Sequence, residues 1–286
     1  MNWKRLALAA ALLGIPAFAQ VDLSGSWQPW PSEDALGNPD LVDYTGLPIN
    51  NFARQWALSW DSDRLGAQEH QCQVHTAGYI YGGPHRLRIW EERDPQTQNI
   101  VALHNYISTY EQNRTIWMDN RPHPPEYAAH TWMGFSTGKW DGNTLTVYTT
   151  HIKQGWYRRN GTPSSDQMTV VEHFIRHGNI LTHVSIATDP VYLAEPFIKT
   201  QSYDVSVNPE GNWLWPCEYV NELPGTPRSS VISYQPGQNP YQTEFAAKYQ
   251  IPMEAALGGP ETMYPEFMDK MKGLKPPAKP SVQGTR

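Results

Sequence analysis

Short runs of β-branched and aromatic residues, separated by turn sequences, dominate the chain between Tyr79 and Thr188. Most neighbouring runs are joined by hairpin signals such as Asp141-Gly142 and Gly178-Asn179. Strands connected in this way form an antiparallel meander, and a meander of this size closes into a barrel or folds into a sandwich. No long helical crossover interrupts the runs, which favours an all-β barrel. The predicted strands are 86–91, 100–110, 115–118, 135–140, 144–151, 168–177 and 180–187, with further strands expected within 191–215.

The remaining segments predict a single domain with short helices in its N- and C-terminal parts. Residues 20–50 are rich in Pro, Gly and Asp and are expected to form an extended arm. Asn50-Asn51 is a helix-capping signal before Phe52 and Trp56, and a second short helix is expected near 244–249. We therefore predict one lipocalin-like barrel domain over 20–274, an antiparallel meander, followed by a Pro-rich disordered tail over 275–286.

The start of the chain has the features of a secretory signal peptide over residues 1–19. Lys4 and Arg5 precede an uncharged apolar run, which ends in an Ala-x-Ala cleavage site at Ala19. The run is shorter than the roughly 18 residues that span a membrane, so we expect cleavage, no stable membrane insertion and a periplasmic or secreted protein. Cleavage removes two of 22 basic and none of 28 acidic residues, so the formal charge of −6 becomes −8. Such an acidic chain argues against nucleic acid as a partner.

Composition adds two expectations about the mature protein. Cys72 and Cys217 are an even pair in an oxidising compartment, which favours a disulfide over two buried thiols. The chain also contains 12 Trp and 15 Tyr, whose rings combine a large apolar surface with a polar group and suit a ligand cavity. Most of these rings are expected to build the core.

The Gly178-Asn179 turn determines which residues share a face of the last predicted hairpin. A two-residue turn pairs His177 with Ile180. One face is then apolar, and we expect it to point into the core. The opposite face is either a solvated wall or a polar lumen, with Glu172 and Arg176 expected in solvent. The first face carries Val171, His173, Ile175 and His177, and the second carries Glu172, Phe174, Arg176, Leu181, His183 and Ser185.

His151 and Asp166 are the candidate catalytic pair. His151 ends a predicted strand and Asp166 precedes the next one, so antiparallel pairing would bring both ends of the loop 152–167 to one rim. A histidine oriented by a carboxylate is a competent general base near neutral pH. Trp156 and Tyr157 in the loop would contact the ligand. The alternative is that Asp166 only caps the loop and that His151 binds a carbonyl.

Further candidate ligand contacts are distributed over several segments. The Pro-rich loop 121–126 would hold Arg121 and His123 rigidly, although it is equally compatible with a stiff surface connection. A GxSxG sequence at 134–138 runs into a predicted hairpin instead of a helix, which excludes a nucleophile elbow. Six of the ten histidines lie between 123 and 183, but none has metal-ligand spacing, so we expect neither a metal nor a cofactor. The alternative is a metal site assembled from distant strands. The remaining candidate contacts are Trp132, Glu172 and His173.

The sequence TWMGFSTGKWDGNTL at 131–145 resembles a block found in a large group of secreted bacterial proteins of uncharacterised function. Four shorter segments resemble the same group, so the resemblance covers most of the mature chain. They are DLSGSW at 22–27, RPHP at 121–124, NGTP at 160–163 and DPVY at 189–192. The resemblance implies a β-barrel-like fold and no particular activity. Similar proteins tend to have His where this chain has Ser164, so no role is transferred to that position.

These observations together predict an exported protein that binds a small apolar or aromatic molecule in an aromatic-lined cavity. Acid–base chemistry of the lyase, isomerase or hydratase type without a metal is the leading hypothesis. The alternatives are a non-catalytic periplasmic ligand-binding protein and a carbohydrate-active module. Two titratable groups converging in the cavity would favour the enzyme, since a binding protein needs only apolar walls and a few polar contacts.

Overall fold

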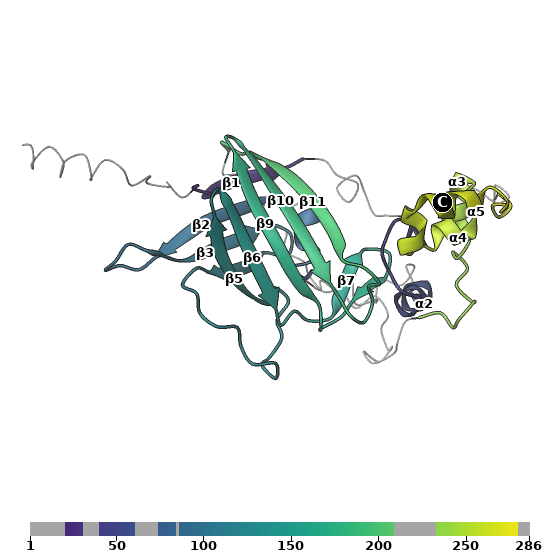
Figure 1. The fold of residues 1–286 in the computed structure, drawn as a ribbon, viewed down its shortest axis with the longest axis horizontal. Coiled ribbons are helices and arrows are strands. Elements are labelled where there is room, and N and C mark those ends of the chain that lie inside the picture. Colours follow the sequence, from purple (N-terminus) through teal and green to yellow (C-terminus); the bar gives the residue numbers. More distant parts are fainter. Residues whose placement is uncertain (1–20, 31–39, 61–73, 84–85, 209–232, 280–286) are drawn as a thin grey trace, which may run out of the picture.

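In a computed structural model, the centre of the molecule is a closed barrel of nine strands (Figure 1). The structure describes residues 21–30, 40–60, 74–83, 86–208 and 233–279. The prediction of an all-β barrel is confirmed. Its strands, in their order around the barrel, are β1 (Gly25–Pro29), β11 (Phe197–Val205), β10 (Ile180–Thr188), β9 (Thr169–His177), β6 (Thr144–Thr150), β5 (Phe135–Asp141), β4 (Gln112–Trp117), β3 (Ile100–Ile107) and β2 (Leu87–Arg93).

The barrel differs from a simple meander at three places. Strands β4 and β5 are parallel, because the Pro-rich segment 118–134 returns along the barrel before β5 begins. Strand β1 lies in the segment expected to be an arm, and it closes the barrel by pairing Trp27 with both Leu87 and Val205. The predicted loop 152–167 contains the separate hairpin of β7 (Gly155–Arg158) and β8 (Thr162–Ser164). The barrel is therefore mixed, with one parallel pair.

Short helices flank the barrel, as predicted. Helix α2 (Asn51–Ser59) begins at Asn50, whose side chain accepts a hydrogen bond from the Ala53 amide at 3.0 Å. Within 233–279, four more helical segments are described: α3 (Glu244–Tyr249), α4 (Met253–Ala256), η4 (Pro260–Met263) and α5 (Pro265–Met271). Arg54 of α2 donates to the Gly258 carbonyl at 2.7 Å and so joins the two helical regions. In the described ranges, no helix has the length and apolar character needed to cross a membrane.

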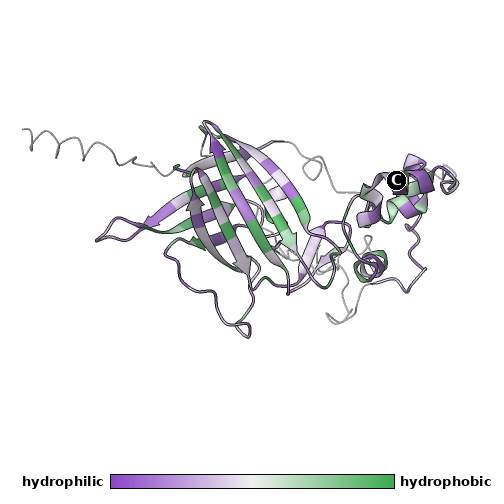
Figure 2. Cartoon of the chain, in the orientation of Figure 1, coloured by the Kyte–Doolittle hydropathy of each residue, from purple (hydrophilic) through white to green (hydrophobic). Residues whose placement is uncertain are grey.

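The apolar core has two parts. One lies inside the barrel, around Trp27, Leu145 and Phe174, and includes Tyr81 of the one-turn helix η2 (Ile80–Gly82). The other lies below β6, β9 and β10, around Tyr44, Tyr157 and Met168. Figure 2 shows apolar and polar residues alternating along the barrel strands, as expected for strands with an inner and an outer face.

Three predictions concern segments that the structure leaves undescribed or only partly describes. The signal peptide 1–19 lies outside the described residues, and so do Cys72 and Cys217. Of the predicted tail 275–286, residues 275–279 are described and form no helix or strand. The signal peptide and the disulfide thus stay predictions.

Candidate functional site

The polar face of the β9–β10 hairpin points into the barrel. The predicted register is confirmed, since His177 pairs with Ile180. The choice of the inner face was wrong, because Glu172, Phe174 and His183 are buried whereas His173 and Ile175 are only partly covered. Glu172, which was expected in solvent, is therefore buried. The more apolar His173 face was expected to point into the core. The Glu172 face can do so instead, because a residue on a distant strand neutralises the Glu172 charge.

That neutralising residue is Arg114 of β4. Arg114 donates two hydrogen bonds to the Glu172 carboxylate, one to Oε1 at 2.9 Å and a shorter one to Oε2. It also donates to the hydroxyl oxygens of Ser136 at 3.1 Å and Thr149 at 2.7 Å. Arg114 and Glu172 are 2% and 0% exposed, so both charges are removed from water. Since a buried charge is tolerated only with such partners, this pair is the electrostatic centre of the barrel.

Glu172 also holds His183. Glu172 Oε1 lies 2.9 Å from Nε2 of His183. Burial opposes ionisation of Glu172, but the Arg114 charge and the hydrogen bonds from Arg114 and His183 outweigh it and lower the Glu172 pKa to about 2. Burial lowers the pKa of His183, and the charges of Arg114 and Lys199 add to this effect. A neutral His183 beside an ionised carboxylate must carry its proton on Nε2, which leaves Nδ1 as an acceptor.

Tyr81 packs over this pair from the one-turn helix η2. Its ring lies 4.4 Å from the His183 ring, and its Oη accepts from Arg114 at 2.9 Å and from Asn105 at 2.8 Å. The Tyr203 hydroxyl in turn donates to the Tyr81 carbonyl at 2.7 Å. The segment 77–82 is thereby attached to the inside of the barrel.

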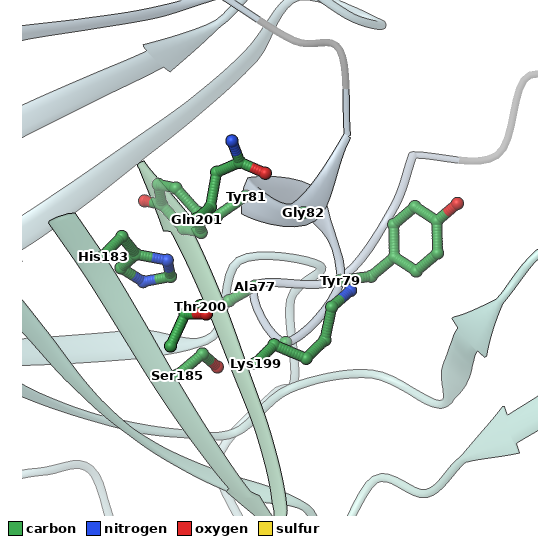
Figure 3. Close-up of a pocket in the computed structure, with 10 residues that line it drawn as sticks. Ala77, Tyr79, Tyr81, Gly82, His183, Ser185, Lys199, Thr200 and Gln201 are labelled. Carbon is green, nitrogen blue, oxygen red and sulfur yellow. The ribbon is translucent and has the colours of Figure 1, made fainter. Parts of the chain in front are cut away.

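A small cavity lies between this segment and strands β10 and β11 (Figure 3). The barrel wall contributes His183, Ser185, Lys199 and Gln201, and the segment 77–82 forms the opposite side. Figure 3 shows the His183 ring projecting from its strand toward Tyr81 and Gln201. The cavity volume is about 10 Å³, which is about enough for one water molecule. The barrel interior is thus largely filled with side chains at this point.

The predicted catalytic pair is not joined in this structure. Strand pairing of Thr149 with Val170 does bring the two ends of the loop 152–167 to one rim. His151, however, has a φ of 57°, which interrupts the alternation of β6. Its Nε2 lies 3.0 Å from the Pro125 carbonyl and its Nδ1 lies 2.7 Å from the Thr150 hydroxyl. Asp166 is exposed, and within the described ranges no hydrogen bond or ion pair links it to His151.

His123 and Arg121 lie on the segment 118–134, outside the barrel. The His123 ring bridges two strands, with Nδ1 at 2.8 Å from Thr150 Oγ1 and Nε2 at 2.9 Å from Thr137 Oγ1. Burial and the neighbouring His151 lower the His123 pKa. Arg121 forms an ion pair with Asp119 and stacks over the Trp117 ring at 3.4 Å. These contacts attach the segment to the barrel wall.

The other predicted ligand contacts are dispersed. Tyr157 is buried, and its hydroxyl donates to Asp189 at 3.2 Å. Trp132 packs against the barrel core under Lys153, and Trp156 is half-buried in β7. His173 lies on the outer face, with Nδ1 at 3.0 Å from the Thr146 hydroxyl. Of all the predicted site residues, Glu172 alone contributes to the buried network.

Sequence reasoning missed Arg114, Tyr81, His183 and Gln201 as site residues. It placed His183 on the same face as Glu172, and the register makes Ser185 the direct partner of Glu172. The sequence did not reveal that Arg114 would be the counter-charge for Glu172. Arg114 pairs directly with Asn105 on the inner side of β3 and β4. The available signal was an arginine and an asparagine in the same every-second-residue series as Leu103, Ile107 and Ile116.

Within the described part of the chain, no group of three or more His, Cys, Asp or Glu side chains is arranged to hold a metal ion. Neither a scan of known protein-family models nor a search of curated proteins finds a match to this chain. The function of the site is therefore inferred from its own geometry.

Proposed function

We propose that this chain is an exported protein that binds a small, largely apolar or aromatic molecule beside His183 and acts on it by acid–base chemistry, with His183 as the base. The observation that carries the proposal is the His183 ring itself. Burial lowers its pKa, its Nε2 lies 2.9 Å from a buried carboxylate, and the residue lines a small cavity. This is the arrangement that a general base requires.

The ion pair with Arg114 supports this role of Glu172. A buried carboxylate without a counter-charge would be protonated. It could then not accept the hydrogen bond that orients the histidine. Arg114 keeps Glu172 ionised, so Glu172 accepts the Nε2 proton and stabilises the imidazolium that forms when Nδ1 takes up a proton. Arg114 and Glu172 are thus positioning residues, and His183 is the catalytic residue.

The apolar surroundings support a small apolar or aromatic ligand. The His183 ring contacts Tyr81 and Phe174, with ring centroids at 4.4 and 4.6 Å. A molecule of several heavy atoms needs more room than about 10 Å³, so its binding requires that the segment 77–82 moves away from β10 and β11. The part of this segment that covers the cavity contains one short turn of helix, η2.

The test is native mass spectrometry of the mature protein purified from its own host, with a matched pair of variants. His183→Asn keeps a donor for Glu172 and removes the base. His173→Asn makes the same change on the outer face of the same hairpin. We expect His183→Asn to retain a small molecule unchanged, and wild type and His173→Asn to convert that molecule when it is added to them.

Two results would change the proposal. Retention of one unchanged molecule by all three proteins would indicate a non-catalytic binding protein. If nothing is retained, and a host small-molecule extract leaves the NMR signals of His183 and Gln201 unshifted, the proposed site is wrong. Export itself is tested separately, by the N-terminal sequence of the mature protein, which we expect to begin at Gln20.

A further inference from the structure

The outward-facing side chains of β6, β9, β10 and β11 form an outer wall that is apolar where a solvated face would be polar. The buried ion pair with Arg114 holds Glu172 inside, so Val171 and His173, its neighbours in β9, point outward. The four strands lie side by side, with no described helix in front of them (Figure 1). An antiparallel sheet usually presents polar side chains on its solvated face. The outer wall therefore has the character of a surface that a partner covers.

One cross-strand row of the outer wall is apolar across all four strands. Tyr148 of β6 pairs with Val171 of β9. Val171 pairs in turn with Ile186 of β10, and Ile186 pairs with Ile198 of β11. The two ends of this row are exposed, Tyr148 at 43% and Ile198 at 61%. None of the four residues belongs to either apolar core, so the row contributes little to the fold that its burial elsewhere would not improve.

The two rows beside it carry no Asp, Glu, Lys or Arg. The nearer row is Thr146, His173, Val184 and Thr200, and its histidine is hydrogen-bonded within the wall, with Nδ1 3.0 Å from the Thr146 hydroxyl. The row after it has Ile175 among hydroxyl side chains. The whole chain, in contrast, has a formal charge of −6. A charged partner would have to bury its ions against this wall without counter-charges, which is costly.

We propose that the outer wall packs against the same wall of a second copy of the chain, in a two-fold symmetric dimer. Two copies of an acidic chain repel one another through their net charge, and this wall lets them meet without bringing like charges together. Two-fold symmetry places the same surface on both sides of the interface. Apolar side chains can then face apolar ones, and hydroxyl groups, which both donate and accept, can face each other. The dimer is independent of the chemistry at His183, which lies on the inner face of β10.

The test is sedimentation velocity of the mature protein over a range of concentrations, with variants of the wall. We expect wild type to sediment as a dimer. Ile198→Asp places a carboxylate at the exposed end of the apolar row and should be monomeric at the same concentrations. Met268→Asp makes a similar change at a side chain that is 55% exposed on α5, away from the wall, and should remain dimeric.

A second variant and a second measurement guard against misfolding. Val184→Thr keeps the shape of the side chain near the middle of the wall but adds a hydroxyl, so it should fold and raise the dissociation constant about tenfold or more. The melting temperature of wild type should rise with protein concentration, because the dimer binds folded chains only. That of Ile198→Asp should be independent of concentration, with a cooperative transition showing that the variant is folded.

Three results would overturn the inference. Wild type may sediment as a monomer at every concentration. A dimer that Ile198→Asp and Val184→Thr leave as stable as wild type would have its interface elsewhere. Binding of monomeric wild type, but not of Ile198→Asp, to vesicles of phosphatidylglycerol and phosphatidylcholine would assign the wall to a lipid surface instead.

Discussion

Arg114 and Glu172, which are 58 residues apart in the chain, form a two-pronged ion pair inside the barrel, with Nη1 2.9 Å from Oε1. This ion pair determines whether the Glu172 carboxylate can stay ionised beside His183. Removing one partner leaves the other charge buried and unpaired, which typically costs about 3–5 kcal/mol. The network is therefore sensitive to single substitutions at either end.

We expect Glu172→Gln and Arg114→Met each to lower the free energy of unfolding by about 3–5 kcal/mol, because each leaves its partner without a counter-charge. The double variant should lose clearly less than the sum of the two, by an interaction energy near the upper end of about 0.5–3 kcal/mol. Chemical denaturation of the four proteins measures this cycle. Simple additivity would mean that the two side chains are not coupled.

Stability should fall in acid in two stages. Because burial lowers the folded pKa of His183 below its ordinary 6.5, the unfolded chain takes up a proton first, and stability decreases as the pH falls below about 6.5. Glu172, with a pKa near 2 in place of 4.5, adds a loss between about pH 4.5 and 2. Unfolding of wild type and His183→Asn across this range separates the first stage. Equal slopes between pH 6.5 and 5 would contradict the assignment to His183.

Gly134 and Gly142 form a matched pair for testing the turn that leads into β5. Both have positive φ values, 67° and 58°, so alanine carries a similar backbone cost at each. A Cβ at Gly134 would lie 2.5 Å from the Thr150 carbonyl, whereas one at Gly142 would meet nothing within 4 Å. Gly134→Ala should therefore be less stable than Gly142→Ala by about 1–3 kcal/mol. Equal melting temperatures would show that the segment 118–134 is not held tightly against β6.

Cys72 and Cys217 should be oxidised in the exported protein, since both would reach an oxidising compartment. Thiol titration of the denatured, unreduced mature protein should find no free thiol. Detection of two thiols per chain would contradict the predicted disulfide.

The local parts of the fold could be predicted from the sequence because they depend on neighbouring residues. The Gly178-Asn179 turn alone fixes the pairing of His177 with Ile180, and helix α3 at Glu244–Tyr249 occurs at its predicted position. Strand β1 could not be recognised, because five residues starting with Gly25 become a strand only through pairing with β2 and β11.

The site was harder to predict from the sequence, because its charges are balanced by residues on strands far apart in the barrel. A glutamate and a histidine on one face of a hairpin indicate a solvated surface unless a cation is available inside. Arg114 supplies that cation from β4, which is not adjacent to β9 or β10. His151, in contrast, was placed correctly at the end of its strand, but its positive φ interrupts the alternation of β6, and its ring contacts the Pro125 carbonyl. Neither effect follows from the spacing of residues in the sequence.

The most direct test is the protonation state of His183, measured by ¹⁵N NMR of the histidine side chains in the mature protein at pH 7. His183 should be neutral, with its proton on Nε2 and with Nδ1 unprotonated, because burial lowers its pKa below the ordinary 6.5. A protonated His183, or a neutral ring with its proton on Nδ1, would contradict the proposal that His183 is a base held by Glu172.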